Sequence, residues 1–338
     1  MKKNSKWKKN AVKVQEKLLF SLINQAKKTK FGKDHNFSEI SNYSDWKKNV
    51  PIREYEELKI YIQEIIDGKK DVLWPGRPLY FCKTSGTTSG TKYIPISTDS
   101  MPYHITAVRD AILSYIAETK NTSIVNGKMI FLQGSPKLNK TGDILTGRLS
   151  GIVAHHTPSY LVKNRLPSYK TNCIENWEDK VDAIVEETLN ENMSLISGIP
   201  PWVQMYFEKL QEKTGEIIKD IFPKFDLFIY GGVNYEPYRQ TFEKLIGKKV
   251  DAIELYPASE GFIAYQDSQT EKGMLLCVNH GIFYEFIASE EYFNKNPNRI
   301  SLDGVEIGVD YVIILNTNAG LWGYNIGDTI KFVSIDPY

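Results

Sequence analysis

The segment from Phe81 to Ser97, FCKTSGTTSGTKYIPIS, concentrates small donor side chains directly before a lysine. Residues 84–91 contain six hydroxyl side chains and two glycines, and Lys92 follows them. Such a loop can bind phosphate, because glycine lets backbone N–H groups approach closely and hydroxyls add donors without bulk. Serine, threonine and glycine are also the ordinary residues of polar turns. The composition alone therefore does not distinguish a phosphate-binding loop from an ordinary polar turn.

The surroundings of this loop distinguish it from a Walker loop, which has the pattern GxxxxGK[ST] and opens a helix. Here Thr91 separates Gly90 from Lys92, and Tyr93 follows the lysine. Strand-like residues precede the loop (LYFC) and follow it (KYIPIS). We therefore expect a loop between two strands.

Two further segments place polar residues where a parallel sheet would bind a ligand. LFIYGGVNYEP, residues 227–237, runs from a strand pattern into two glycines and then Asn234, an expected helix N-cap. LYPASEGFIA, residues 255–264, ends a strand pattern with small residues and Glu260. Ligands gather at the carboxyl ends of strands in such sheets. The glycines could also mark only a close backbone crossing, and Glu260 only a solvent-facing charge.

His155, His156 and Arg109 are weaker candidates. Histidine often acts as a general base, but no nearby serine, cysteine or carboxylate pattern completes a catalytic triad. A structural or pocket-lining role is therefore favoured for both histidines. Arg109 falls on the helix expected after the phosphate loop, where it could face an acid substrate or simply be exposed.

The elements that must position these residues alternate between strands and helices. Helical patterns cover residues 176–190 and 200–215. Strand patterns lie at 129–134, 193–198, 227–232 and 250–256. This alternation predicts an α/β fold with mainly parallel sheets flanked by helices. After residue 270 strand follows strand, which predicts a smaller antiparallel or barrel-like β subregion over residues 271–335.

The composition is typical of a globular protein with one large domain or two ordinary ones. The chain has 338 residues, 41% hydrophobic and 25% charged. No apolar run approaches the ~20 residues that span a bilayer, and the start lacks the features of a signal peptide. We expect a cytoplasmic protein without a membrane span.

The cysteines are widely spaced, which favours buried thiols over a disulfide framework or zinc site: Cys82, Cys173 and Cys277.

Positive charge is concentrated at the start of the chain. The first 33 residues contain eleven lysines and one acidic residue. These lysines could contact anionic lipid or nucleic acid. However, one helical face is marked by Ala11, Val14, Leu18, Leu22 and Ala26. We therefore favour an amphipathic helix packed on the body with its lysines in solvent, and we expect no nucleic-acid partner.

Four segments together resemble one known family. TSGTTSGTKYIP resembles the phosphate loop of adenylate-forming enzymes, in the form used by the auxin-responsive promoter (Gretchen Hagen) family of acyl acid amido synthetases. GGVNYEPY is similar to that family's adenine-side segment, LYPASEGFIA to its Tyr-x-x-Ser-Glu-Gly segment, and NTNAGLWGYNIGDTIKF to its Gly-Leu-Tyr/Trp…Gly-Asp segment. All four occur in the family's order, and FGKDHNF, VPIREYEELK and SGIPPWV are similar to its bacterial branch. The fold implied is the large N-terminal domain of adenylate-forming enzymes.

The resemblance implies roles for the residues at matching positions. Lys92 would be a catalytic cation on the β- and γ-phosphates of ATP, together with the donors Thr84, Ser85, Gly86, Thr87 and Thr88. The rest of the nucleotide-binding segments would be Gly232, Val233, Tyr256, Ala258 and Ser259, with the adenine between Gly232–Val233 and Tyr256. Glu260, also catalytic, would bind Mg²⁺, and Asp328 would accept hydrogen bonds from the ribose hydroxyls.

The implied reaction has two steps. A carboxylic acid and ATP give an acyl-adenylate and pyrophosphate, and the amine of an amino acid then displaces AMP. The implied cofactors are ATP and Mg²⁺, and the implied partners are a small carboxylic acid and its acceptor. Two alternatives stay open: transfer of the acyl group to coenzyme A or a carrier thiol, and a nucleotide-binding module without turnover.

Two features depart from the family pattern. Many members have arginines within the stretch from Trp322 to Asn325, so any role of those arginines is lost or supplied elsewhere. The chain also stops ten residues after Asp328, where the family's hinge leads into a smaller C-terminal domain with a lysine used in adenylation. We therefore expect residues 1–330 to form the large acyl-adenylating domain and residues 331–338 to begin the hinge, with the small domain absent.

Overall fold

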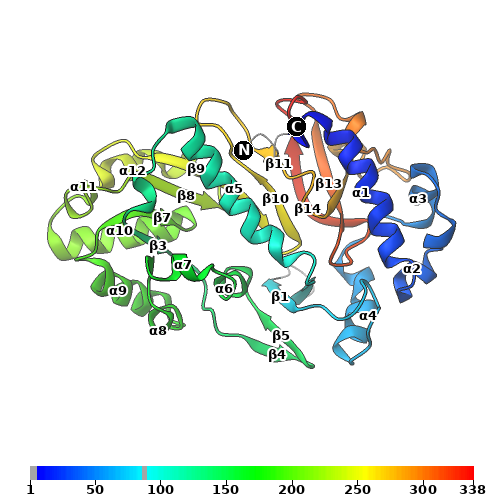
Figure 1. Ribbon diagram of the computed structural model, residues 1–338, viewed down its shortest axis with the longest axis horizontal. Coiled ribbons are helices and arrows are strands. Elements are labelled where there is room, and N and C mark those ends of the chain that lie inside the picture. Colours follow the sequence, from blue (N-terminus) through cyan, green and yellow to red (C-terminus); the bar gives the residue numbers. More distant parts are fainter. Residues whose placement is uncertain (1–5, 86–89) are drawn as a thin grey trace.

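The part of the chain that the structure describes folds into three β-sheets flanked by helices, in the α/β class (Figure 1). The computed structural model describes residues 6–85 and 90–338. The α-helices of these residues are α1 (Ala11–Ala26), α2 (Lys30–Asp34), α3 (Tyr43–Asn49), α4 (Tyr55–Ile66), α5 (Met101–Thr119), α6 (Leu149–Ala154), α7 (Ser159–Val162), α8 (Tyr169–Asn172), α9 (Trp177–Thr188), α10 (Pro200–Thr214), α11 (Ile218–Ile221) and α12 (Arg239–Ile246).

The largest sheet has seven strands in the order β11-β10-β9-β8-β7-β3-β6. Its strands are β3 (Lys128–Phe131), β6 (Arg165–Leu166), β7 (Met193–Ser197), β8 (Leu227–Gly231), β9 (Asp251–Ala258), β10 (Gly261–Tyr265) and β11 (Leu275–Leu276). The strands from β9 to β6 are parallel, whereas β10 and β11 run antiparallel to their neighbours. The predicted parallel sheet is therefore confirmed, with β3, β7, β8 and β9 at the predicted positions.

The two predicted helices between these strands are confirmed as α9 and α10. Asn176 caps α9, because its side chain accepts a hydrogen bond from the Asp179 amide at 3.0 Å. Helix α10 begins at Pro200 and ends before Gly215, whose φ of +74° is a left-handed conformation that favours glycine. The buried sides of both helices pack against β7 and β8 and cover this part of the sheet.

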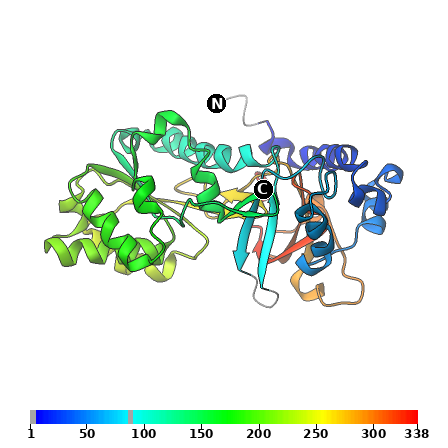
Figure 2. The same cartoon turned by 90° about the horizontal axis from the view of Figure 1, so that it is seen from below.

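The strands on either side of the hydroxyl-rich loop form a hairpin in a second sheet of order β2-β1-β5-β4. Its strands are β1 (Tyr80–Ser85), β2 (Thr91–Ile96), β4 (Asn139–Thr141) and β5 (Ile144–Gly147). β1 and β2 pair in antiparallel register with Thr84 opposite Lys92, and Figure 2 shows them side by side, projecting from the body. The expected position of the loop between two strands is confirmed.

The third sheet is antiparallel, as predicted for the end of the chain. It consists of β12 (Ile282–Ala288), β13 (Asp310–Thr317) and β14 (Tyr324–Lys331). One strand of the predicted 271–335 subregion behaves differently: β11 pairs with β10 and extends the seven-stranded sheet. The β9–β10 pairing leaves the other edge of β10 free, and the chain turns back onto that edge.

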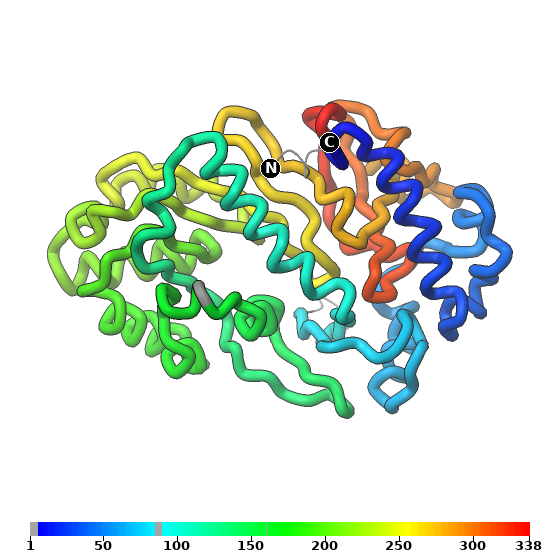
Figure 3. Tube along the Cα trace, viewed as in Figure 1, coloured from blue at the N-terminus to red at the C-terminus, as the bar shows by residue number. Residues whose placement is uncertain are grey.

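Helix α1 packs against the third sheet, beside the orange and red strands of Figure 3. Its buried face includes the amide of Gln15, whose Nε2 donates to the carbonyl oxygens of Val278 at 2.7 Å and Ile282 at 2.8 Å. Gln15 Oε1 accepts from the amide of Tyr284 at 2.8 Å. The predicted amphipathic helix is thus confirmed, with Lys13 exposed on its outer side.

The expectation of buried thiols holds for two of the three cysteines. Cys82 and Cys277 are buried, Cys173 is partly exposed, and all three thiols are free. Within residues 6–85 and 90–338, no helix has both the length and the apolar character needed to cross a bilayer.

Candidate functional site

The hairpin carries the described part of the hydroxyl-rich loop. Thr84 and Lys92 lie opposite each other one pair before the end of the ladder, and Ser85 lies opposite Thr91, the first residue of β2. The predicted phosphate-binding residues Gly86, Thr87 and Thr88 lie outside the described residues. The hairpin therefore presents one hydroxyl and one ammonium group on neighbouring strands where the loop begins and ends.

A hydrogen bond attaches this hairpin to the turn between β9 and β10. The buried thiol of Cys82 on β1 donates to Ser259 Oγ at 3.2 Å. Burial raises the pKa of Cys82 to about 11, so the thiol keeps the proton that it donates. Ser259 and Glu260 form the turn itself, since Ala258 pairs with Gly261. The structure thus brings Ala258, Ser259 and Glu260 beside the strand that leads into the loop.

Glu260 lies half-buried where three segments come together. Burial raises the pKa of its carboxyl group to about 7. The charge of Lys92 on β2 lowers this pKa, and the charge of Asp328 on β14 raises it. Side chains from the hairpin, from the β9–β10 turn and from β14 are therefore close enough to influence one another electrostatically.

The surroundings of Glu260 suit one kind of metal ion. Mg²⁺ usually takes one or two carboxylates from a protein and completes its coordination with substrate phosphates and water. A dication beside Glu260 would offset the cost of burying the ionised carboxylate. No group of three His, Cys, Asp or Glu side chains among the described residues could hold a metal by itself. The residues present therefore fit a magnesium ion bound together with phosphate, and they do not form a closed protein cage.

Tyr256 and Asp328 link β9 to β14. The hydroxyl of Tyr256 donates a hydrogen bond to Asp328 Oδ2. Burial, and then this hydrogen bond, raises the pKa of Tyr256, so the hydroxyl remains a donor at ordinary pH. Asp328 is exposed, so a ligand can reach its carboxylate. Two residues that the family resemblance assigns to one nucleotide are thus in direct contact.

The segment after β8 passes close to β9. A Cβ atom on Gly231 would lie 2.4 Å from the carbonyl oxygen of Leu255, so no side chain fits there. Gly232 has a φ of +75°, a left-handed conformation that favours glycine. Val233 follows with its side chain exposed. Both glycines therefore have structural reasons: Gly231 lies at a close backbone crossing with β9, and Gly232 adopts a left-handed conformation.

The helix expected to begin at Asn234 begins slightly later. The 3₁₀-helix spans Glu236–Tyr238, and its N-cap is Tyr235. The side chain of Asn234 instead accepts a hydrogen bond from the Glu236 amide at 3.0 Å, within an Asx turn. The expected N-cap is therefore wrong by one residue, because Asn234 stabilises the turn that precedes the helix.

His155, His156 and Arg109 form no catalytic triad. His155 Nε2 forms a hydrogen bond with the carbonyl oxygen of Pro136 at 2.7 Å, and His156 Nε2 with the hydroxyl of Tyr80 at 3.0 Å. Arg109 is exposed and forms an ion pair with its neighbour in the chain at 3.0 Å. These contacts agree with structural roles for the histidines and with an exposed position for the arginine.

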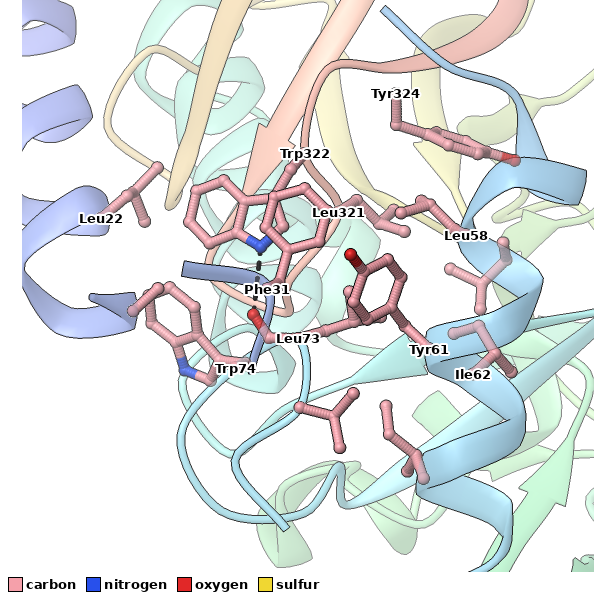
Figure 4. Packing of buried hydrophobic residues seen from close by; sticks show 14 of the residues in the cluster. Leu22, Phe31, Leu58, Tyr61, Ile62, Leu73, Trp74, Leu321, Trp322 and Tyr324 are labelled. Carbon is pink, nitrogen blue, oxygen red and sulfur yellow. Dashed lines mark hydrogen bonds between the residues drawn. The ribbon is translucent and has the colours of Figure 1, made fainter. Parts of the chain in front are cut away.

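The stretch that departs from the family pattern is part of the core (Figure 4). Trp322 is fully buried among aromatic side chains such as Phe31, and its Nε1 donates to the carbonyl oxygen of Leu73 at 3.0 Å. A Cβ atom on Gly323 would lie 2.4 Å from the carbonyl oxygen of Pro51. An arginine side chain therefore does not fit at Gly323 in this backbone.

Sequence patterns do not single out Tyr55, the first residue of α4. Its hydroxyl accepts a hydrogen bond from the amide of Tyr93 at 2.8 Å, and its ring centroid lies 5.9 Å from Lys92 Nζ. Helical periodicity can indicate that Tyr55 is buried. The same periodicity cannot indicate that Tyr55 contacts Tyr93, which lies 38 positions further along the chain.

Comparison with known proteins identifies the family. The model of the GH3 family N-terminal domain matches residues 1–168 and 143–250, and that of the GH3 family central domain matches residues 275–337. A jasmonoyl–L-amino acid synthetase of Nicotiana attenuata is 21% identical, with 96% of this chain and 67% of that protein covered. An indole-3-acetic acid-amido synthetase of Arabidopsis thaliana is 23% identical, with 94% and 64% covered.

Solved structures show the same fold. The GH3.15 acyl acid amido synthetase in complex with 2,4-DB has a TM-score of 0.76 at 16% identity, covering 96% of this chain and 66% of that protein. A 2-hydroxyisobutyryl-CoA ligase in complex with 2-HIB-AMP and CoA has a TM-score of 0.60 at 13% identity, covering 94% and 62%. The chain thus spans about two thirds of the length of these relatives. Its fold is that of the large N-terminal domain of adenylate-forming enzymes, and the chain belongs to the GH3 family.

Proposed function

We propose that the chain activates a carboxylic acid with ATP as an acyl-adenylate, and that the acyl group is then joined to the amine of an amino acid. The observation that carries this proposal is the meeting of segments far apart in the sequence. The β1–β2 hairpin, the β9–β10 turn and β14 are linked by the Cys82–Ser259 and Tyr256–Asp328 hydrogen bonds, and the segment after β8 packs against β9. Each segment offers groups suited to a different part of a nucleotide.

The nucleoside end lies at β9 and β14. Asp328 accepts hydrogen bonds from the ribose hydroxyls, since one carboxylate offers an acceptor to each hydroxyl of a diol. The ring of Tyr256 packs against the adenine, with the backbone of Gly232 and Val233 on its other side. A side chain at Gly232 is absent, and the nearest atom to its Cβ position is Ile199 Cγ2 at 3.8 Å, so the base can approach.

The phosphate end lies at the hairpin and at Glu260. Lys92 and Thr84 contact the β- and γ-phosphates. As a carboxylate oxygen of the acid attacks the α-phosphorus, charge moves to the departing pyrophosphate, where Lys92 stabilises it. The acid is already ionised at neutral pH, so the first step needs positioning and no general base. Glu260 would hold Mg²⁺, which would supply positive charge against the repulsion between phosphates.

The acceptor of the second step is an amine. The amine nitrogen attacks the acyl carbon, and AMP leaves. The GH3 family models and the amido synthetases that match this chain over nearly its whole length support this acceptor. A thiol such as coenzyme A is the second candidate, since the CoA ligase shares the fold.

The proposal is tested by measuring pyrophosphate and AMP separately. With MgATP and a panel of carboxylic acids, we expect pyrophosphate release that depends on one class of acid. Adding amino acids should then release AMP. Release of AMP only with coenzyme A would replace the second step by thioester formation. Nucleotide binding without any acid-dependent pyrophosphate would reduce the chain to a nucleotide-binding module.

A further inference from the structure

Strand β2 has a support outside the proposed nucleotide site. It is an edge strand, and β1 is its one partner among the described strands, so its outward N–H groups need other partners. The amide of Tyr93 finds one in the hydroxyl of Tyr55, at 2.8 Å. Because Lys92 is the preceding residue, this hydrogen bond fixes the backbone directly beside the ammonium-bearing side chain.

The ring of Tyr55 makes a second contact with the same strand. Lys92 Nζ lies 5.9 Å from the ring centroid, within the range of a cation–π contact. Tyr55 itself is held firmly, since it is only 4% exposed and opens a helix whose first turn is closed by the Glu54 amide donating to Glu57 Oε2 at 2.7 Å. Burial raises the pKa of Tyr55, so its hydroxyl stays protonated.

Backbone hydrogen bonds extend this support to β14. The amide of Arg53 donates to the carbonyl oxygen of Gly323 at 2.8 Å, and the amide of Asn325 donates to the carbonyl oxygen of Arg53 at 2.9 Å. The short segment that ends at Tyr55 thus contacts both the strand of Lys92 and the strand of Asp328. These two residues are proposed to hold opposite ends of one nucleotide.

We propose that Tyr55 is a positioning residue for Lys92. It holds β2 against α4 and keeps the Lys92 ammonium directed toward the β- and γ-phosphates of ATP, while it touches no substrate itself. The inference rests on the proposed ATP site. Because AMP lacks these two phosphates, Tyr55 should matter for the binding of MgATP and not for the binding of AMP.

Two substitutions separate the two contacts. Tyr55→Phe removes the hydroxyl and keeps the ring, whereas Tyr55→Leu removes both. Neither contact is made with the nucleotide, so its free energy sets the largest loss of affinity that its removal can cause: about fivefold for one neutral hydrogen bond, and about two- to fivefold more for a cation–π contact. Titration calorimetry should therefore show MgATP affinity reduced by up to about fivefold in Tyr55→Phe and by up to about 10- to 25-fold in Tyr55→Leu. AMP affinity should stay within about twofold of the unmodified chain.

Tyr61, on the same helix, offers a matched control. Its hydroxyl donates to Asp34 at 3.0 Å, and Lys30 Nζ lies 5.1 Å from its ring centroid, but neither partner belongs to the proposed site. Tyr61→Phe and Tyr61→Leu should leave the ratio of ATP to AMP affinity unchanged. In a Lys92→Met background, Tyr55→Leu should change MgATP affinity less than about twofold, because the group that it positions is gone.

Equal losses for ATP and AMP in the Tyr55 variants, or no loss for either, would overturn the inference. The nucleotide site would still stand in that case if the unmodified chain binds MgATP and Lys92→Met weakens this binding. If the unmodified chain binds neither nucleotide, the proposed function and the role of Tyr55 fail together.

Discussion

The hydrogen bond between Tyr256 and Asp328 leads to opposite predictions for its two partners. Asp328 is proposed to accept the ribose hydroxyls, yet the hydroxyl of Tyr256 already donates to its Oδ2. Each carboxylate oxygen has two lone pairs, so the tyrosine does not block Oδ2, but it weakens Oδ2 as an acceptor and competes with a ribose hydroxyl for it. Removing the tyrosine hydroxyl should therefore favour nucleotide binding, whereas removing the carboxylate should oppose it.

The size of both effects follows from the exposure of the site. A hydrogen bond to a charged group contributes about 1.5 to 3 kcal/mol, and the lower end applies because Asp328 is exposed to competing water. About 1.4 kcal/mol corresponds to tenfold in Kd. Tyr256→Phe keeps the ring and frees the carboxylate, so AMP affinity should rise by about three- to tenfold. Asp328→Ala should lower AMP affinity by about tenfold or more.

Calorimetry with two ligands checks this reasoning. AMP tests the full interaction, and its 2′,3′-dideoxy analogue lacks the hydroxyls that Asp328 is proposed to bind. Asp328→Ala should therefore change the affinity for the analogue by less than about twofold. If Tyr256→Phe weakens AMP binding as much as Asp328→Ala does, the tyrosine hydroxyl itself binds the nucleotide and the reasoning is refuted. An unchanged AMP affinity in Tyr256→Phe would show that the two groups do not compete.

Two further predictions concern the phosphates and acid stability. Lys92→Ala should weaken MgATP binding by about tenfold or more and AMP binding by less than twofold, and equal losses in calorimetry would contradict the proposed contact with the outer phosphates. Burial lowers the pKa of both His104 and His280 to about 4. At His280 two nearby charges act in opposite directions: Asp110 raises the pKa and Arg109 lowers it. Because unfolded histidine titrates near pH 6.5, the free energy of unfolding should be retained above pH 6.5 and fall by up to about 3 kcal/mol per histidine as the pH drops to 4. Denaturant titrations at pH 7.5 and pH 5 should show that His104→Asn loses less free energy of unfolding between these pH values than the unmodified chain does. An equal loss in both proteins would show that His104 does not contribute to the acid sensitivity.

Local patterns in the sequence predict most of the elements that position the site. An apolar run followed by glycine marks β7 and β8, and Asn176 and Pro200 mark the starts of two helices. The motif residues can be named because each lies within one short segment. Such patterns depend on neighbours in the chain, so they are informative within an element.

These local patterns do not predict contacts between different helices and strands. The pairing of Cys82 with Ser259 and of Tyr55 with Tyr93 joins residues from different elements, and periodicity indicates burial without naming the partner. The sheet to which β11 belongs could not be predicted either, because a strand of two residues has no pattern that favours one sheet over another. The close backbone crossing at Gly323 also could not be predicted, because it depends on where the tertiary fold places residue 51.

The contacts of Gln15 also bear on the order in which the chain folds. Its backbone partners lie more than 260 residues further along the chain. During synthesis α1 leaves the ribosome long before β12 exists, so its apolar face has no sheet to cover in the meantime. Contacts that close such long loops form slowly, whereas the parallel strands of the seven-stranded sheet follow one another closely in the chain. We therefore expect α1 to dock late. Until then it is an amphipathic helix within the lysine-rich start of the chain, and its uncovered apolar face is a suitable binding site for a chaperone on the nascent chain.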